Sequence, residues 1–439
     1  MKKRICTMFL AIALILSIFS GCGTTEKSDS QASSAAKTSG SAAVSTPEGQ
    51  IPVNLTFWWA GSGPNSENYV KKACEMIHEK YNYITVDGSS IAWNDYPTKL
   101  NVAFAGGTAP ELFALGFNQL YANASNVMVL NDHIKDWDGW NDIDETILNY
   151  GKIDDKFYGF LYPEIKLMTY RKDFFKEAGL DPNTPPSTKE EMYEYAKKLT
   201  VTDKNGNIQR AGFELPTTGG DQGYFPLLLM FGVDKFWDDN YDLTLNQPEA
   251  LEAAKYAKSF FDGKAATYSD QHSVQGSLFE NGITAMSLSI SSAYYAALDQ
   301  KIGFDKIGVA IPPSGKVLTA GSFISIYKNA KNVDAAVKAW EVLSSKEAML
   351  MIAKEMGFVP TRASARDEYI AMNKEINSIV YEGMTKAAVY GKANPYFYDF
   401  RDTAFNPHLE EMYYGKITPE ECLKQTIEQY DELRKASKK

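Results

Sequence analysis

Hydrophobic and polar positions alternate with strand and helix periods from residue 53 onward. Residues 53–59, Val-Asn-Leu-Thr-Phe-Trp-Trp, are rich in β-branched and aromatic side chains and predict a strand. Apolar residues recur at helical spacing over 67–81, and the short apolar segment 84–86 predicts a second strand. A helix over 96–105 and a third strand at 111–115 follow. This β-α-β-α-β order predicts a parallel sheet covered by helices.

Helix-start signals mark the second half of the chain. Ser187 with Glu190, and Thr418 with Glu421, have the spacing of a capping box. Pro248 stands at the first position of another predicted helix. Further helices are predicted over 333–344 and from 419 to about 434, and further strands at 283–288, 307–311 and 323–327. The alternation of predicted helices and strands therefore predicts an α/β fold throughout the body of the chain.

The N-terminus has the pattern of a secretory signal. Three basic residues at 2–4 precede the apolar stretch 5–19, which is shorter than the roughly 20 residues that a spanning helix needs. The stretch ends in Phe-Ser-Gly-Cys22, which resembles the bacterial lipoprotein box, with Phe where Leu is usual. The resemblance implies that residues 1–21 are a signal peptide and that Cys22 is lipidated. A plain secretory signal with an incidental cysteine is the alternative.

The segment after Cys22 has the composition of a tether. Residues 23–50 are mostly Ser, Ala, Thr, Gly and charged residues, which cannot bury enough surface to offset chain entropy. A flexible chain of about 28 residues spans roughly 30 Å. We therefore expect residues 22–50 to be a lipidated cysteine and a disordered tether that holds an extracytoplasmic body at the cell membrane.

Composition and cysteine content exclude several classes. With 439 residues, the chain is expected to form more than one domain, and its net charge of −10 argues against binding to nucleic acid. The four histidines are isolated, so no metal site is expected. Beyond the signal and its cysteine, Cys74 and Cys422 remain. We expect buried free thiols, with a bridge between the two as the alternative.

Enzyme motifs are absent or incomplete. The sequence contains no G-x-S-x-G, and Asn82 stands where the zinc motif that begins at His78-Glu79 needs its second histidine. Residues 203–207 resemble a calcium loop that lacks its distal Glu, and we predict a turn there. No cofactor is expected. A glycoside hydrolase stays open as an alternative, because an acidic protein offers many carboxylate pairs.

Eight segments, in order, resemble one known family. The chain resembles the extracellular solute-binding proteins of ABC importers, in the sugar-binding class that includes maltose-binding protein. Glu111 and Arg171 replace the family's usual Asp and Asn. The segments that carry the resemblance are 93–100, 105–112, 156–163, 168–173, 279–286, 321–330, 357–362 and 415–421.

The resemblance implies an architecture and a function. Two α/β lobes, joined by several crossings, would hold the ligand in a cleft between them and close by hinge motion. The N-terminal lobe is expected at 51–161 and 313–358, and the C-terminal lobe at 162–312 and 359–435. The protein would be a monomeric receptor, not an enzyme, that delivers a carbohydrate, here an oligosaccharide, to ABC permease subunits. A polyamine, a peptide or a metal complex as the ligand is the alternative.

Candidate ligand residues combine aromatic faces with hydrogen-bonding groups, as a sugar site requires. Trp58 and Trp59 end the first strand, where open α/β sheets bind ligands, and we favour Trp59 over Trp58 as the residue facing the cleft. The resemblance adds Asn118 and Gln119 after the third strand, and Glu164 with Tyr162 after the first crossing. It also adds Ser292, Tyr294, Tyr224, Trp237, Arg362, Phe397, Tyr398 and Arg401.

Overall fold

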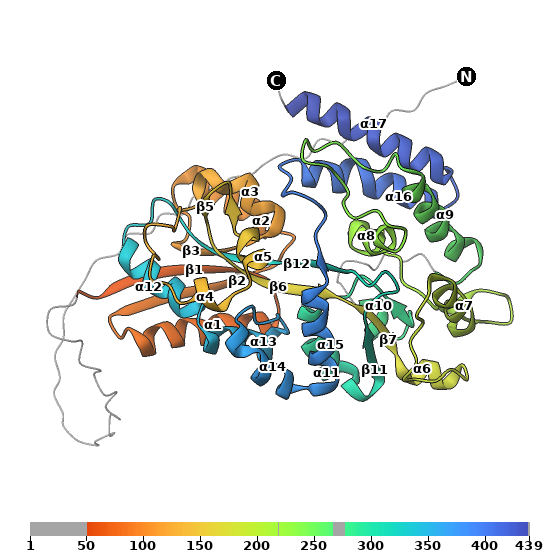
Figure 1. Ribbon diagram of the computed structural model, residues 1–439, viewed down its shortest axis with the longest axis horizontal. Helices are drawn as coiled ribbons and strands as arrows, with labels where there is room; N and C mark the ends of the chain where they lie inside the picture. The colour runs from red at the N-terminus through yellow and green to blue at the C-terminus, as the bar shows by residue number, and fades with distance from the viewer. Residues whose placement is uncertain (1–50, 218, 267–276, 438–439) are drawn as a thin grey trace, which may run out of the picture. The chain divides into compact units, whose positions relative to one another are not determined.

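A computed structural model describes residues 51–217, 219–266 and 277–437 (Figure 1). The predicted signal peptide, Cys22 and the tether lie outside the described residues. The chain begins with β1 (Val53–Ala60), α1 (Pro64–Lys80), β2 (Ile84–Ile91), α2 (Tyr96–Gly106), β3 (Leu112–Gly116), α3 (Phe117–Asn123), α4 (Gly139–Asp142), α5 (Glu145–Tyr150), β4 (Lys152–Ile153) and β5 (Lys156–Phe157).

The rest of the described chain adds further strands and helices. The middle of the chain forms β6 (Phe160–Lys166), β7 (Met168–Arg171), α6 (Lys172–Glu177), α7 (Lys189–Leu199), β8 (Val201–Thr202), β9 (Ile208–Arg210), α8 (Gly220–Met230), α9 (Pro248–Asp262), α10 (Ser277–Glu280), β10 (Met286–Ser287), α11 (Tyr295–Ile302), β11 (Ile307–Ala310) and β12 (Val317–Ile326). The end forms α12 (Val333–Leu343), α13 (Lys346–Met356), α14 (Arg366–Met372), α15 (Lys374–Thr385), β13 (Ala387–Ala388), the π-helix η5 (Asp399–Phe405), α16 (Asn406–Tyr413) and α17 (Pro419–Ser437).

The first lobe is built on a mixed sheet, in which the predicted strands run parallel and β12 runs antiparallel to β3 and β6. Its strand order is β13-β12-β3-β1-β2, with β6 also paired to β12. β1 runs parallel to β2 and to β3, which confirms the β-α-β-α-β prediction. An apolar core lies around the sheet, and Trp340 on α12 donates its indole N–H to the carbonyl of Ile324 at 2.8 Å.

Two adjacent strands connect this lobe to the second one. β6 and β12 pair antiparallel from Phe160↔Ile324 to Lys166↔Leu318 (Figure 1). Phe160 belongs to the first apolar core, whereas Leu318 belongs to the second. The predicted strand at 323–327 was therefore too short, because the structure extends it from Val317 through this crossing. The exact lobe boundaries stay a prediction.

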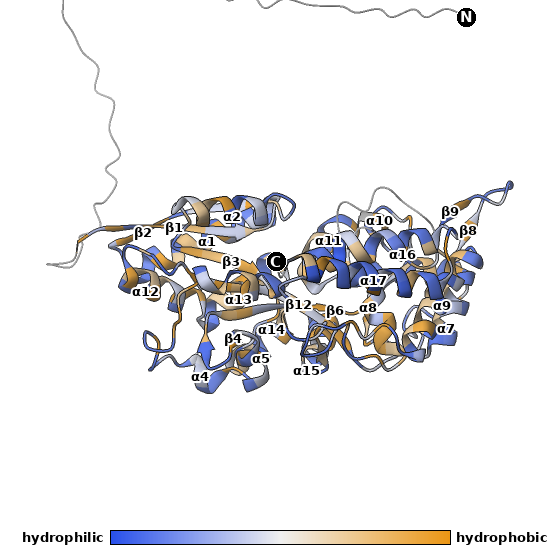
Figure 2. Ribbon diagram, turned by 90° about the horizontal axis from the view of Figure 1, so that it is seen from above, coloured by the Kyte–Doolittle hydropathy of each residue, from blue (hydrophilic) through white to orange (hydrophobic). Residues whose placement is uncertain are grey.

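The second lobe has a small antiparallel sheet and a helical layer. The sheet order is β10-β7-β11, and only Met286 and Ser287 of the predicted strand 283–288 belong to it. Phe236, Trp237 and Phe400 lie at the centre of an aromatic core. Figure 2 shows α17 as largely hydrophilic along its length, while its inward side chains, among them Tyr430, are buried.

Local capping explains where two helices begin. At α17, Thr418 and Glu421 form the predicted capping box, with the Glu421 N–H donating to Thr418 Oγ1 at 3.1 Å and the Thr418 N–H donating to Glu421 Oε2 at 2.8 Å. At α7 the prediction was one residue early. Thr188, not Ser187, caps the helix by accepting from the Glu191 N–H at 3.0 Å.

Several smaller predictions have clear outcomes. Cys74 and Cys422 are both free, but only Cys422 is fully buried, since Cys74 is half-buried on α1. Asp203 accepts hydrogen bonds from the N–H groups of Asn205 and Asn207, both at 2.8 Å, and so closes the predicted turn. Over the ranges that the structure describes, no helix is both long enough and apolar enough to cross a bilayer.

Candidate functional site

Helix α3 carries two buried amides at the carboxyl end of β3. Asn118 and Gln119 are 6% and 3% exposed. Gln119 Oε1 accepts from the Gly116 N–H at 2.8 Å, and the Gln119 side chain also hydrogen-bonds Tyr398. Asn118 Oδ1 accepts from the backbone N–H of Asn394 at 3.1 Å. Both amides therefore join the first lobe to residues that follow β13.

Tyr398 contacts both Gln119 and the guanidinium group of Arg401. The guanidinium carbon of Arg401, on η5, lies 5.0 Å from the centre of the Tyr398 ring, within cation–π range. Arg401 also forms a bidentate pair with Asp402, at 2.6 and 2.9 Å. The positive charge of Arg401 is thus already matched by a carboxylate.

Asp221 is an enclosed acid in the first turn of α8. It is 1% exposed, and its Oδ2 accepts from the Tyr390 hydroxyl at 2.8 Å. Its Oδ1 is buried and has no hydrogen-bond partner among the described residues. Burial raises the pKa of Asp221, while the charges of Arg401 and Lys166 act in the opposite direction. A buried unpaired acceptor is rare in proteins and points to a missing partner.

The crossing strand β6 supplies a buried ion pair. Lys166 is fully buried, its Nζ lies 3.7 Å from Glu164 Oε1, and it donates to the carbonyl of Ser289 at 3.3 Å. Burial lowers the pKa of Lys166, and the negative charges of Glu164 and Asp221 counter that shift. The second oxygen of Glu164 accepts from the Ser291 hydroxyl at 2.8 Å.

Hydrogen bonds, ion pairs, a cation–π contact and the charge interactions of Asp221 with Arg401 and Lys166 connect these residues into one set, which we call the polar cluster. It joins four predicted site residues to three that sequence reasoning missed. A charged residue inside the apolar run of β6 was a usable signal for Lys166, and the glycine pair at the start of α8 was one for Asp221; nothing marked Tyr390. The members are Gln119, Glu164, Lys166, Asp221, Tyr390, Tyr398 and Arg401.

Comparison with protein families assigns the chain. A model of the bacterial extracellular solute-binding protein family matches residues 72–378. The chain belongs to this family. The polar cluster of this solute-binding protein brings together residues of α3, the crossing strand β6 and the second lobe.

Individual relatives are distant in sequence. The sn-glycerol-3-phosphate-binding periplasmic protein UgpB of Escherichia coli (strain K12) is 22% identical over 296 residues, covering 61% of this chain and 64% of that protein. The chain thus spans less than two thirds of the length of the curated relatives that it matches.

Solved structures share the two-lobe α/β fold. The ABC substrate-binding protein Lmo0181 from Listeria monocytogenes, in complex with cycloalternan, is 21% identical with a TM-score of 0.75, covering 87% of this chain and 99% of that one. UgpB from Mycobacterium tuberculosis, in complex with glycerophosphocholine, is 17% identical with a TM-score of 0.76, covering 89% and 100%. At these identities the likeness concerns the fold.

Of the two tryptophans of β1, the one we favoured for the cleft packs in the core. Trp59 is 0% exposed, and its ring packs against Tyr69 and Phe358 at centroid distances of 4.7 and 5.6 Å. Trp58 is only partly buried, with Lys99 Nζ 5.0 Å from its ring centre. The expectation that Trp59 faces out of the core was wrong, because Trp59 shares a strand face with Phe57 and Leu55.

Several other predicted residues have structural partners. Tyr162 is fully buried, and its hydroxyl donates to the carbonyl of Leu343. Arg362 is 3% exposed and pairs with Asp138 at 2.6 Å and Asp142 at 3.3 Å, so it braces the first lobe. Their roles as ligand contacts stay predictions.

The remaining candidates pack within or beside the second lobe. Tyr224 and Trp237 are fully buried, and the Trp237 indole donates to the Lys392 carbonyl at 2.6 Å. Ser292 Oγ accepts from the Ile165 N–H at 3.1 Å, and the Tyr294 hydroxyl donates to Glu280 at 2.8 Å. Phe397 is 7% exposed and stacks on Tyr390 of the polar cluster at 5.7 Å.

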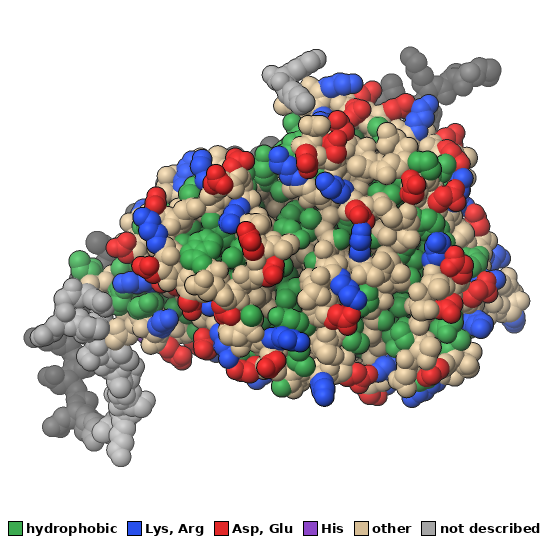
Figure 3. Space-filling model, viewed as in Figure 1, with side chains coloured by type: hydrophobic (Ala, Val, Ile, Leu, Met, Phe, Trp, Pro, Cys, Tyr) green, Lys and Arg blue, Asp and Glu red, His purple; other side chains and the backbone are tan. Residues whose placement is uncertain are grey.

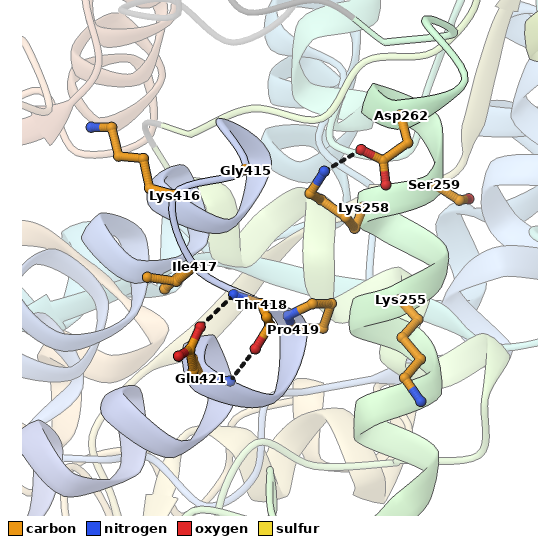
Figure 4. A pocket seen from close by; sticks show the side chains of 10 residues that line it. All are labelled: Lys255, Lys258, Ser259, Asp262, Gly415, Lys416, Ile417, Thr418, Pro419 and Glu421. Atoms are coloured by element: carbon orange, nitrogen blue, oxygen red, sulfur yellow. Dashed lines mark hydrogen bonds and ion pairs between the residues drawn. The ribbon is translucent and has the colours of Figure 1, made fainter.

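Two surface hollows lie away from the polar cluster. One, of about 450 Å³, is lined by the end of α9 and the start of α17, where Lys258 pairs with Asp262 (Figure 4). The other, of about 400 Å³, lies between β11 and α15. Neither hollow contains any of the predicted site residues. Most of their lysines and carboxylates form ion pairs at the surface, and such exposed pairs contribute little to stability.

Proposed function

We propose that this solute-binding protein is a receptor for a neutral carbohydrate of more than one sugar unit, which it delivers to the permease of an ABC transporter. One observation supports the neutral ligand most strongly. Both cations of the polar cluster are matched by carboxylates, Lys166 by Glu164 and Arg401 by Asp402. A phosphate ester would need uncommitted positive charge.

The donors and acceptors of the polar cluster suit hydroxyl groups. A sugar hydroxyl both donates and accepts, so it can donate to the unpaired Asp221 Oδ1 and accept from nearby donors. Tyr398 and Phe397 add ring faces beside the guanidinium of Arg401. This combination of few polar groups and aromatic faces is typical of small-molecule sites. The complex of the Listeria relative with cycloalternan supports the same ligand class.

A glycerol phosphate compound is the second candidate. The E. coli relative is named for sn-glycerol-3-phosphate, and the M. tuberculosis structure holds glycerophosphocholine. The paired cations of the polar cluster argue against this ligand, so the two candidates predict different outcomes in one screen.

A thermal-unfolding screen tests the proposal. Maltotriose, mannobiose, cellobiose and xylobiose are compared with glycerol-3-phosphate, glycerophosphocholine and spermidine. A sugar present at 100 times its dissociation constant should add about 2.7 kcal/mol of stability. Lys258→Ala, in the hollow of Figure 4, is the matched control and should respond like the wild type. Stabilisation by the phosphate compounds or spermidine alone would overturn the proposal.

We also propose that the receptor is held at the membrane by a lipid on Cys22, through the tether at 23–50. The family is extracellular, and a receptor that serves a membrane permease is more effective when it stays near it. On the face that Figure 3 shows, acidic and basic side chains of the described residues are interspersed. Binding to anionic lipid would need a surface patch in which basic side chains cluster without acidic ones.

A further inference from the structure

Trp93 occupies a distinctive position between β2 and α2. It is 43% exposed, and among the chain's seven tryptophans, all within the described ranges, it alone is exposed. The turn that carries it follows the carboxyl end of β2, beside the carboxyl ends of β1 and β3. Ligands of open α/β sheets bind at that edge.

The indole lies next to the polar cluster. Trp93 Cη2 and Gln119 Oε1 are each 3.4 Å from the point that a Cβ at Gly116 would occupy, so the two atoms lie within about 7 Å of each other. Because Gly116 has no side chain, the Trp93 ring can lie this close to α3. Gln119 in turn contacts Tyr398, which continues the polar cluster.

The exposed Trp93 ring packs against Tyr96, which is itself held by hydrogen bonds. Tyr96 packs edge-on against Trp93, with ring centres 5.9 Å apart and planes at 61°. The Tyr96 hydroxyl donates to the carbonyls of Ala114 at 2.7 Å and Trp58 at 3.2 Å, on neighbouring strands. A ring held in this way loses little freedom when a ligand packs on it, which favours binding.

We propose that Trp93 is the stacking surface for an outer sugar unit, while the polar cluster holds an inner one. This rests on the proposed carbohydrate function and assigns a subsite within it. Gln119 is 3% exposed and Trp93 is 43% exposed, so the inner unit is enclosed and the outer unit lies at the open end of the site. The receptor therefore prefers chains of two or more units and tolerates extension beyond Trp93.

Calorimetric titration of matched sugars tests this subsite. Each monosaccharide is paired with its oligosaccharide: mannose with mannobiose, glucose with maltotriose and with cellobiose. Trp93→Ala should weaken the oligosaccharide roughly tenfold, since both the aromatic stack and its buried area are lost. It should leave the monosaccharide unchanged. Trp93→Phe should recover part of the loss, and Tyr414→Ala, 41% exposed on the other lobe, should have no effect.

Acrylamide quenching supplies a second readout. Because Trp93 is the exposed indole, it should dominate quenching of the free wild type, and a saturating oligosaccharide should protect it. Unchanged oligosaccharide affinity in Trp93→Ala, or an equal loss for monosaccharide and oligosaccharide, would overturn the outer subsite. If no sugar binds the wild type, the proposed function fails and the subsite fails with it.

Discussion

Replacing Asp221 with Asn removes a charge while keeping the shape of the polar cluster. Asp221 Oδ1 is enclosed and has no partner among the described residues, so a sugar hydroxyl that donates to it displaces no existing protein contact. A hydrogen bond to a charged group contributes about 1.5–3 kcal/mol, which corresponds to roughly 10- to 150-fold in the dissociation constant. Asp221→Asn should weaken carbohydrate binding within that range.

The same substitution should not destabilise the free protein. Burial raises the pKa of Asp221, so ionising this carboxyl costs stability once the pH rises above its unfolded value. Asn carries no charge and avoids that cost. At acidic pH, where Asp221 is neutral, the variant and the wild type should melt alike; toward neutral pH the variant should be at least as stable. Lost binding without lost stability is the expected signature.

Titration calorimetry with the sugar selected by the screen, together with melting curves from pH 3 to 8, measures both effects. Asp242→Asn is the matched control, because Asp242 pairs with Arg434 outside the polar cluster. It should leave affinity unchanged. An Asp221→Asn variant that binds within twofold of the wild type, or that melts well below it at neutral pH, would refute this reasoning.

Three further predictions concern the core, pH and anchoring. Trp59→Ala should cost about 3–5 kcal/mol in urea unfolding, and Trp58→Ala clearly less; equal losses would contradict the burial difference. Glu214 is buried and accepts hydrogen bonds from the hydroxyls of Thr284 and Ser289. Burial raises the pKa of Glu214 to about 7, so the free energy of unfolding should fall by roughly 3 kcal/mol as the pH rises from 4.5 to 7. Glu214→Gln should flatten this dependence of the melting temperature on pH; the same dependence in variant and wild type would count against the prediction. Cys22→Ala should release the protein from membranes in a fractionation assay, and continued attachment would exclude the lipid anchor.

Local signals predicted the elements whose formation is local. The patterns of β1, α1, α2 and β3 were sufficient, because β1, α1 and α2 each bury mainly one face and β3 is a short apolar run buried on both faces. The α7 cap was one residue off because two hydroxyl residues precede two acids there, and both registers satisfy the motif. The first half of β12 was missed because it is stabilised by pairing with β6, about 155 residues earlier in the chain.

The candidate site was predictable only in part. The resemblance named Gln119, Glu164, Tyr398 and Arg401 as ligand contacts, and the structure places all four in the polar cluster; their ligand roles stay predictions. Lys166 and Asp221 have local sequence signals, but their role in the polar cluster depends on contacts with residues far away in the chain, such as Ser289 and Tyr390. The choice between Trp58 and Trp59 failed because helices cover both faces of a parallel sheet, so alternation alone does not tell which face is better packed.

A crystal structure of the protein with the sugar selected by the screen tests the central claim most directly. We predict a sugar hydroxyl within about 2.7–3.2 Å of Asp221 Oδ1 and a second sugar unit on the face of Trp93. Phosphate compounds should not occupy the polar cluster. Sugar density in the hollow of Figure 4, or elsewhere with Asp221 Oδ1 still unpaired, would contradict the account.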